Sequence, residues 1–373
     1  MKKVSDLLQV DELFAEARAA GVPILAPNFE SATELLAELK AAQAIADRFG
    51  IKRVPLMPSV TLAYPDRGNV AGRGGAYQDF AKTLTERYSQ SELDQFSRLG
   101  FHMSNSDIDC FDGTDWFPNV YCIFTIDHGR PVVDRALLED PAALDNVGVV
   151  MYDVTETLKL HPELKNDRAK AIEIMAGQAA EFKSRFGDRV RVESACDILP
   201  EAPEKGSLPD PEDTFTRPDE MKRFLSLSGV DFYAPSIGTE HRARNPEGAE
   251  KLYRESLVQE LSGVVAGMDQ YADVDGSIFS LHGSSCLDPS SPSNEGLWKK
   301  LHGMVIFRYY TGLSKTQGQA LKQWVDDGER RIAENSKEGL HVHASSGRDW
   351  HIVEKLQPEL TQVMVNIGYE QLA

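Results

Sequence analysis

Short apolar runs that end abruptly at acidic or imidazole side chains recur along this chain. One run begins near Val120 and stops at Asp127, His128 and Gly129. Later runs end in the same way at Asp153, Glu193, His241 and His282. In a barrel of parallel strands, the groups that do chemistry collect at the carboxyl ends of several different strands. These side chains can therefore meet at one site although they lie far apart in the sequence.

Segments with a helical period separate the apolar runs, for example residues 5–20 and 163–186. Counted through, the pattern gives eight strand-helix alternations followed by a helical tail. Alternation of this kind predicts a parallel sheet, and eight repeats predict that the sheet closes. We expect a single α/β domain over residues 1–373. It would be a (β/α)8 TIM barrel over about residues 20–335 with a helical C-terminal extension over about residues 336–373.

Local patterns also predict individual elements. Residues 53–58 are expected to form one strand that ends at Ser59. Thr216 stands two residues before Pro218 and is the candidate N-cap of the next helix. The long period over residues 163–186 predicts one continuous helix.

The charge balance excludes several kinds of partner. Forty basic and 58 acidic residues give a formal net charge of -18, which repels nucleic acid and anionic lipid. No stretch of the sequence is expected to span a membrane. The four cysteines form no CxxC pair, and the N-terminus does not resemble a signal peptide, so we expect a cytoplasmic protein. An anionic substrate would need local positive charge inside the site, from a metal or from arginines.

The three histidines at strand ends point to a metal. For one histidine alone, an isolated polar side chain would be the better interpretation. Three imidazoles at neighbouring strand ends, with carboxylates beside them, favour a zinc site.

Five short motifs in a fixed order carry a family resemblance. They are residues 125–129 (TIDHG), 151–153 (MYD), 216–220 (TRPDE), 237–241 (IGTEH) and 281–285 (LHGSS). Together they resemble the zinc-dependent class II fructose-bisphosphate aldolases, particularly the longer form, over most of the chain. The resemblance implies that His128, His241 and His282 hold the catalytic zinc. It also implies that Glu193 and Asp153 serve a second or alternative cation position, divalent or monovalent.

The same resemblance implies the proton carriers. Asp127 matches the catalytic acid of the family. The second carrier is a glutamate on a loop, eight residues after the metal-site glutamate, which leads to Glu201 here. Pro200 and Ala202 flank it instead of the glycines of the family, and Glu204 close by is the alternative.

The substrate pocket departs from the family. Arg242 stands where the family has a glycine, and the end of the last strand keeps only Thr311 of its motif, with Arg308 in place of an asparagine. The residues expected to contact substrate are Asn28, Ser59, Arg242, Gly283, Ser284, Ser285, Arg308, Thr311 and Arg348. A guanidinium group suits a carboxylate or a differently placed phosphate or sulfonate. We therefore expect fructose 1,6-bisphosphate to be a poor substrate. The alternative is that both Arg242 and Arg308 turn outward or pair with Glu240 or another acid.

These observations lead to one main hypothesis and two alternatives. The main one is a homodimeric zinc-dependent aldolase that makes or cleaves a carbon-carbon bond next to a carbonyl. Its substrate would be a small anionic ketose-like molecule, phosphorylated or carboxylated. A zinc-dependent epimerase of a ketose or keto-acid needs the same metal chemistry and would release no aldehyde. A non-catalytic protein that binds metal or sugar phosphate is the third possibility.

Overall fold

The computed structural model describes residues 1–29, 32–61, 117–145, 147–197, 214–239, 253–274, 276–284, 289–298, 300–301, 303–310 and 345–373. Eight of its strands form a closed barrel in the order β10-β11-β2-β4-β6-β7-β8-β9. Every neighbouring pair is parallel. The strands are β2 (Ile24–Asn28), β4 (Ser59–Thr61), β6 (Thr125–Gly129), β7 (Val149–Tyr152), β8 (Arg191–Ser194), β9 (Phe232–Tyr233), β10 (Phe279–Leu281) and β11 (Met304–Tyr310). The predicted α/β TIM barrel is confirmed.

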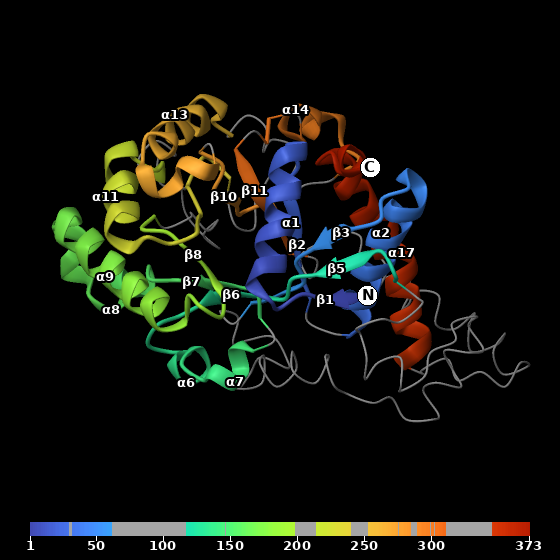
Figure 1. Cartoon of the computed structure of the whole chain (residues 1–373), viewed down its shortest axis with the longest axis horizontal. Coiled ribbons are helices and arrows are strands. Elements are labelled where there is room, and N and C mark those ends of the chain that lie inside the picture. The colour runs from blue at the N-terminus through green and yellow to red at the C-terminus, as the bar shows by residue number, and fades with distance from the viewer. Residues whose placement is uncertain are drawn as a thin grey trace, which may run out of the picture.

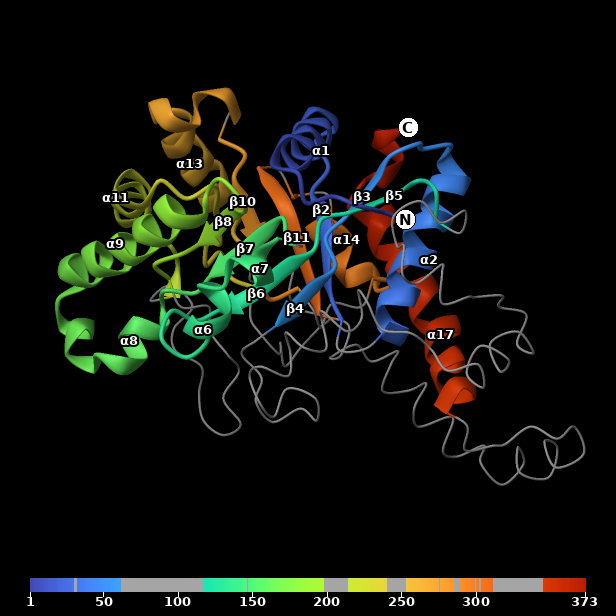
Figure 2. The same cartoon turned by 60° about the horizontal axis from the view of Figure 1, so that its bottom comes forward.

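Helices surround the barrel (Figure 1). The longer ones are α2 (Ala32–Phe49), α9 (Arg168–Phe186), α11 (Pro218–Ser228) and α13 (Glu255–Ala266). Short helices are α6 (Arg135–Leu138), α7 (Pro141–Leu144), α8 (Glu156–Leu160), α14 (Glu295–Trp298), η2 (Pro162–Asn166), η3 (Asp269–Val274) and η4 (Pro292–Asn294). The helical C-terminal extension is present as α17 (Ser345–Asn366) and η6 (Tyr369–Leu372). α17 lies along α2 in both views (Figures 1 and 2).

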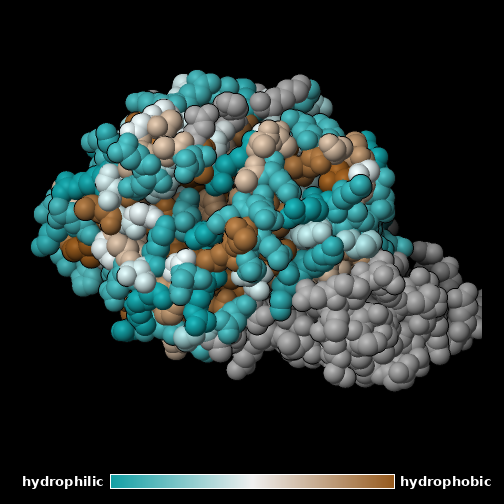
Figure 3. Space-filling view, in the orientation of Figure 1, coloured by the Kyte–Doolittle hydropathy of each residue, from teal (hydrophilic) through white to brown (hydrophobic). Residues whose placement is uncertain are grey.

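Most large apolar side chains of the described residues are buried in the core around these elements. The face in Figure 3 is mainly hydrophilic, and its hydrophobic residues form separate patches. No helix in the described part of the chain has the length and apolar character that crossing a bilayer requires.

Helix α1 (Leu7–Ala20) closes the amino-terminal end of the barrel. The Asp6 side chain caps its start by accepting from the Leu8 amide at 2.8 Å, and Gly21 ends it at a φ of 68°. The buried face of α1 contacts apolar side chains that point into the barrel. The packed residues are Val10, Leu13, Phe14 and Ala17 of the helix and Ile24, Val149, Phe232 and Ile306 of the strands. Figure 2 shows α1 on the side opposite to the end toward which β4, β6 and β11 point.

A second, three-stranded parallel sheet contains β1 (Lys2–Lys3), β5 (Val120–Cys122) and β3 (Val54–Leu56). The prediction of one strand over residues 53–58 is therefore wrong. The chain pairs as β3 in this small sheet and enters the barrel only at Ser59, as β4. The run that starts at Val120 divides in the same way into β5 and β6. The described side chains on both sides of each change of sheet are mostly buried, so hydrophobicity alone does not mark the change.

Two helix predictions are also corrected. The cap position of α11 is Arg217, and its side chain makes no capping bond. The Thr216 hydroxyl instead donates to Asp197 Oδ2 at 2.6 Å and accepts from the Ser236 amide at 2.8 Å. The long helix over residues 163–186 divides into η2 and α9 at Asp167, whose side chain accepts from the Lys170 amide and caps α9.

Candidate metal centre

The barrel interior changes from apolar to polar along its axis. Above the layer that packs on α1, near the level of the carboxyl end of β2, the strands and the residues directly after them carry buried polar side chains. They are Asn28, Ser59, Asp127, Glu193, His282 and Arg308, each at most 5% exposed. A polar group in a barrel interior is costly unless it is paired, so this layer marks the end of the barrel where chemistry is expected.

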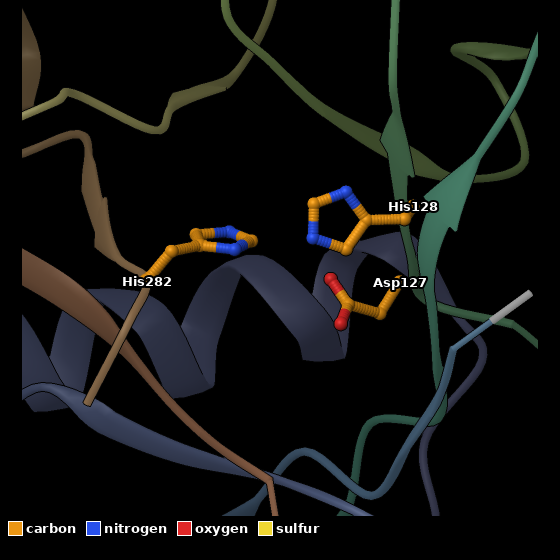
Figure 4. A group of neighbouring side chains, drawn as sticks. All are labelled: Asp127, His128 and His282. Atoms are coloured by element: carbon orange, nitrogen blue, oxygen red, sulfur yellow. The ribbon is translucent and has the colours of Figure 1, made fainter. Parts of the chain in front are cut away.

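An irregularity in β6 places Asp127 and His128 in the same site. In a regular strand, neighbouring side chains point to opposite faces. Here Ile126 pairs with Val150 but Gly129 pairs with Tyr152, so β6 has one extra residue against β7. His128 takes a φ of 53°, which is uncommon for a residue with a side chain. A ligand atom from each of Asp127, His128 and His282 then lies within 4.8 Å of the others (Figure 4).

A carboxylate orients each imidazole. His128 Nδ1 lies 3.0 Å from Asp153 Oδ2, and His282 Nε2 lies 2.7 Å from Glu193 Oε1. The two rings meet edge to face, with their centroids 5.3 Å apart. A carboxylate behind a histidine fixes the ring and raises its basicity, as in many metal sites. The candidate ligand atom of each ring is the nitrogen on the side away from its carboxylate.

The charges of the site reinforce one another. Burial opposes ionisation of Asp127, but His128, Arg308, His282 and the Asn28 amide outweigh it and lower the pKa of Asp127 below its usual range. Burial likewise opposes ionisation of Glu193, but Arg308 and His282 lower its pKa to about 2. Burial acts to lower the pKa of His128, yet Asp127 and Asp153 raise it to about 9. These acids therefore attract positive charge to the imidazoles, as a metal site requires.

Arg308 lies within this layer. Its guanidinium pairs with Glu193 Oε2, donates to Ser59 Oγ at 3.2 Å and lies 3.6 Å from Asp127 Oδ1. The side chain is 3% exposed. A residue that was expected to contact substrate is thus in contact with two carboxylates of the site.

Other residues expected to contact substrate also support the site internally. The Asn28 amide donates to Asp127 Oδ2 at 2.8 Å. The Ser59 hydroxyl donates to the Met57 carbonyl at 2.9 Å, and the Ser284 hydroxyl donates to the carbonyl of Arg308. Gly283 takes a φ of 75°, a conformation that glycine adopts without strain.

Several predicted residues lie outside the described part of the chain. They are Glu201, Glu204, His241, Arg242, Ser285 and Thr311. The backbone of Arg348 is described within α17, but its side chain is not.

Sequence reasoning missed Thr155. Its amide and hydroxyl both donate to Asp153 Oδ1, the amide at 3.1 Å, and leave Oδ2 for His128. Thr155 follows Asp153 by two residues, which is the spacing of an Asx turn, so this signal was present in the sequence.

The comparisons with known proteins agree with this architecture. No family model and no curated protein matches the chain. A candidate fructose-1,6-bisphosphate aldolase from Coccidioides immitis matches with a TM-score of 0.56 and 15% identity, and the match covers 100% of both chains. The YdjI aldolase from Escherichia coli K12 matches with a TM-score of 0.53 and 14% identity over 96% of each chain. The fructose-bisphosphate aldolase from Campylobacter jejuni gives 0.59 and 13%, over 98% of this chain and 95% of that one.

The chain has the fold of these aldolases. Identity at this level shows a shared fold and leaves the activity to be argued from the site.

Proposed function

We propose that this chain is a zinc-dependent aldolase, acting on a small anionic ketose-like substrate that is phosphorylated or carboxylated. One observation carries the proposal: Asp127, whose pKa is lowered by its charged neighbours, lies beside two carboxylate-oriented imidazoles at the carboxyl end of the barrel. The aldolase names of the similar structures support it. We also propose that the protein works in the cytoplasm as a homodimer.

The described donors fit a divalent metal. The ring nitrogens of His128 and His282 lie within 4.8 Å of one another and of an Asp127 oxygen, and imidazole nitrogens are donors that zinc accepts. His128 and His282 would hold the ion, with His241 as the third imidazole by resemblance. When bound, zinc supplies a Lewis acid that polarises the oxygens of the substrate.

The proton chemistry belongs to the chain itself. Asp127 is held as an anion, and the Asn28 amide fixes one of its oxygens, so the carboxylate can accept the hydroxyl proton during cleavage. In the reverse direction it returns that proton to the new hydroxyl. We propose Glu201 as the carrier for the carbon-bound proton, and Arg242 and Arg348 as groups that attract the anionic end of the substrate.

Asp127→Asn tests the proposal. Loss of a positioned acid or base commonly costs ~10² to 10⁴ in rate, so cleavage should fall by that order while the zinc content stays near that of the wild type. The assay presents ketose phosphates and ketose acids to the enzyme and traps the aldehyde that is released. The matched control is Asp188→Asn, an exposed aspartate just before β8, which should leave the rate unchanged.

Three outcomes would count against the aldolase. Inversion of configuration at a substrate carbon without release of aldehyde would indicate the epimerase. Binding of substrate without turnover would indicate the non-catalytic protein. Trapping of the enzyme by borohydride in the presence of substrate would indicate an imine instead of a metal mechanism.

Fructose 1,6-bisphosphate itself is expected to be cleaved with kcat/KM well below ~10⁴ M⁻¹s⁻¹.

A further inference from the structure

Two carboxylates in the barrel share one guanidinium group. Arg308 reaches Glu193, Ser59 and Asp127 from β11, on the opposite side of the barrel from β7. An arginine that is 3% exposed loses much of its hydration, so it needs paired anions in fixed positions. The position of Arg308 between these groups is therefore a structural feature of the site.

Glu193 and Asp153 both match positions for a second or alternative cation, yet their oxygens already have partners. Glu193 Oε1 lies 2.7 Å from His282 Nε2, and Oε2 pairs with Arg308. Asp153 Oδ2 lies 3.0 Å from His128 Nδ1, and Oδ1 accepts from Thr155. A second metal at either carboxylate would have to displace one of these partners.

The charge balance of the described site leads to the same result. Counted by formal charge, the carboxylates of Asp127, Asp153 and Glu193 contribute three negative charges, and the Arg308 guanidinium, which pairs with Glu193 and lies 3.6 Å from Asp127 Oδ1, contributes one positive charge. One divalent ion with neutral imidazoles makes this group neutral. A second divalent ion would leave two uncompensated positive charges in the barrel interior, where unpaired charge is costly.

We propose that Arg308 takes the place of a second cation, so that this centre binds one divalent ion and Glu193 orients His282 without binding metal. Arg308 is then a positioning residue: it holds Glu193 behind His282 and holds Asp127 beside Ser59. This inference rests on the proposed metal site and adds its stoichiometry and the role of Arg308.

Metal stoichiometry tests the inference without an activity assay. The metal-free protein is titrated with Zn²⁺, and with Co²⁺ for its absorption spectrum, while bound metal is measured by elemental analysis after dialysis. Wild type should bind about one ion per chain. Arg308→Gln removes the counter-ion and frees a Glu193 oxygen, so it should bind about two ions at the same excess of metal. Arg308→Lys keeps the charge and should stay at about one.

The control is Arg53→Gln, a partly exposed arginine that pairs with Glu16 at 2.8 Å outside the barrel, and it should behave as wild type. In Arg308→Gln, added guanidinium ion should displace the second cobalt and restore the wild-type spectrum. This rescue would not occur if Arg308 only filled space.

Three results would overturn the inference: a second ion in wild type, a second ion in Arg308→Lys, or a single ion in Arg308→Gln at the same excess. If Arg308→Gln does not fold, the wild type and Arg308→Lys decide the question, because a second ion in either contradicts it. Wild type that binds no metal overturns the proposed function together with this inference. One ion per chain without aldehyde release would overturn the aldolase and leave the single-ion centre standing.

Discussion

His128 combines an unusual backbone with a defined side-chain partner. For a residue with a side chain, the left-handed region costs about 1–2 kcal/mol, and His128 at a φ of 53° carries this cost inside a barrel strand. This backbone conformation directs the imidazole toward Asp127 and His282, and the contact between His128 Nδ1 and Asp153 holds the ring there. A strained backbone conformation persists only where the surrounding structure holds it in place, and residues with such conformations are concentrated at functional sites.

Asp153→Asn should weaken zinc binding by about 10- to 100-fold, because an amide cannot supply the negative charge that orients and activates His128. Competition with a chelator of known affinity measures the change. The chain contains a matched pair on its surface, where His161 Nδ1 lies 3.2 Å from Glu163 Oε1 and both side chains are more than half exposed. Glu163→Gln should leave zinc affinity unchanged. Equal affinities in Asp153→Asn and wild type would show that Asp153 does not support the metal site.

At this scale, the sequence predicted that Asp127, His128 and His282 meet but not how they are arranged. Polar groups at strand ends pointed to Asp127, His128 and His282 because parallel strands end at one edge. The extra residue in β6 could not be predicted, since it depends on pairing with β7. The partners of Arg308 were not predicted either, because they come from strands that become neighbours only when the barrel closes.

Among the elements, α1 shows that a periodic pattern can predict a helix without predicting the surface against which the helix packs. The period of the sequence predicted a helix over residues 5–20, and Asp6 and Gly21 set the ends of the observed helix, whose buried face consists of Val10, Leu13, Phe14 and Ala17. The surface that covers this face was not predicted, because periodicity identifies a buried side without identifying its partner. The partner is the apolar layer of the barrel, where Phe14 and Phe232 lie with ring centroids 4.5 Å apart.

Phe14→Ala should therefore lower the free energy of unfolding by about 3–5 kcal/mol, the usual loss for a fully buried phenylalanine. Urea unfolding followed by circular dichroism measures it. Leu8 lies in the same helix but is 69% exposed, so Leu8→Ala should change stability by no more than about 0.5 kcal/mol. If the two variants lost similar stability, α1 would not be packed against the barrel as described.

Over the whole molecule, the C-terminal residues contact β2 and β3 at a point where the two strands do not pair with each other. β2 pairs with β4 only at Asn28 and Ser59, because the preceding residues of that run belong to β3 in the small sheet. The Leu25 amide and the Pro55 carbonyl therefore lack a ladder partner from the neighbouring strand. The hydroxyl of Tyr369 lies between them, accepting from Leu25 at 2.9 Å and donating to Pro55 at 2.8 Å.

This contact could not be predicted from the sequence, since it joins positions 344 residues apart and fills a gap that local patterns do not reveal. Tyr369 is fully buried, and burial raises the pKa of its hydroxyl, which stays a donor at neutral pH. The C-terminal residues thus complete the hydrogen bonding between the barrel and the small sheet.

Tyr369→Phe keeps the ring but leaves a buried amide and a buried carbonyl without this partner. Leaving a buried polar group unsatisfied costs about 1–3 kcal/mol. Because the amide and the carbonyl both lose their partner, the free energy of unfolding should fall by at least an amount in that range. Urea unfolding measures the loss, and hydrogen exchange should show faster exchange of the Leu25 amide. Tyr121→Phe is the control, because that hydroxyl only accepts from Lys2 at an exposed position and its loss should cost no more than about 0.5 kcal/mol. Unchanged protection of the Leu25 amide in Tyr369→Phe would mean that the C-terminal residues do not complete this sheet.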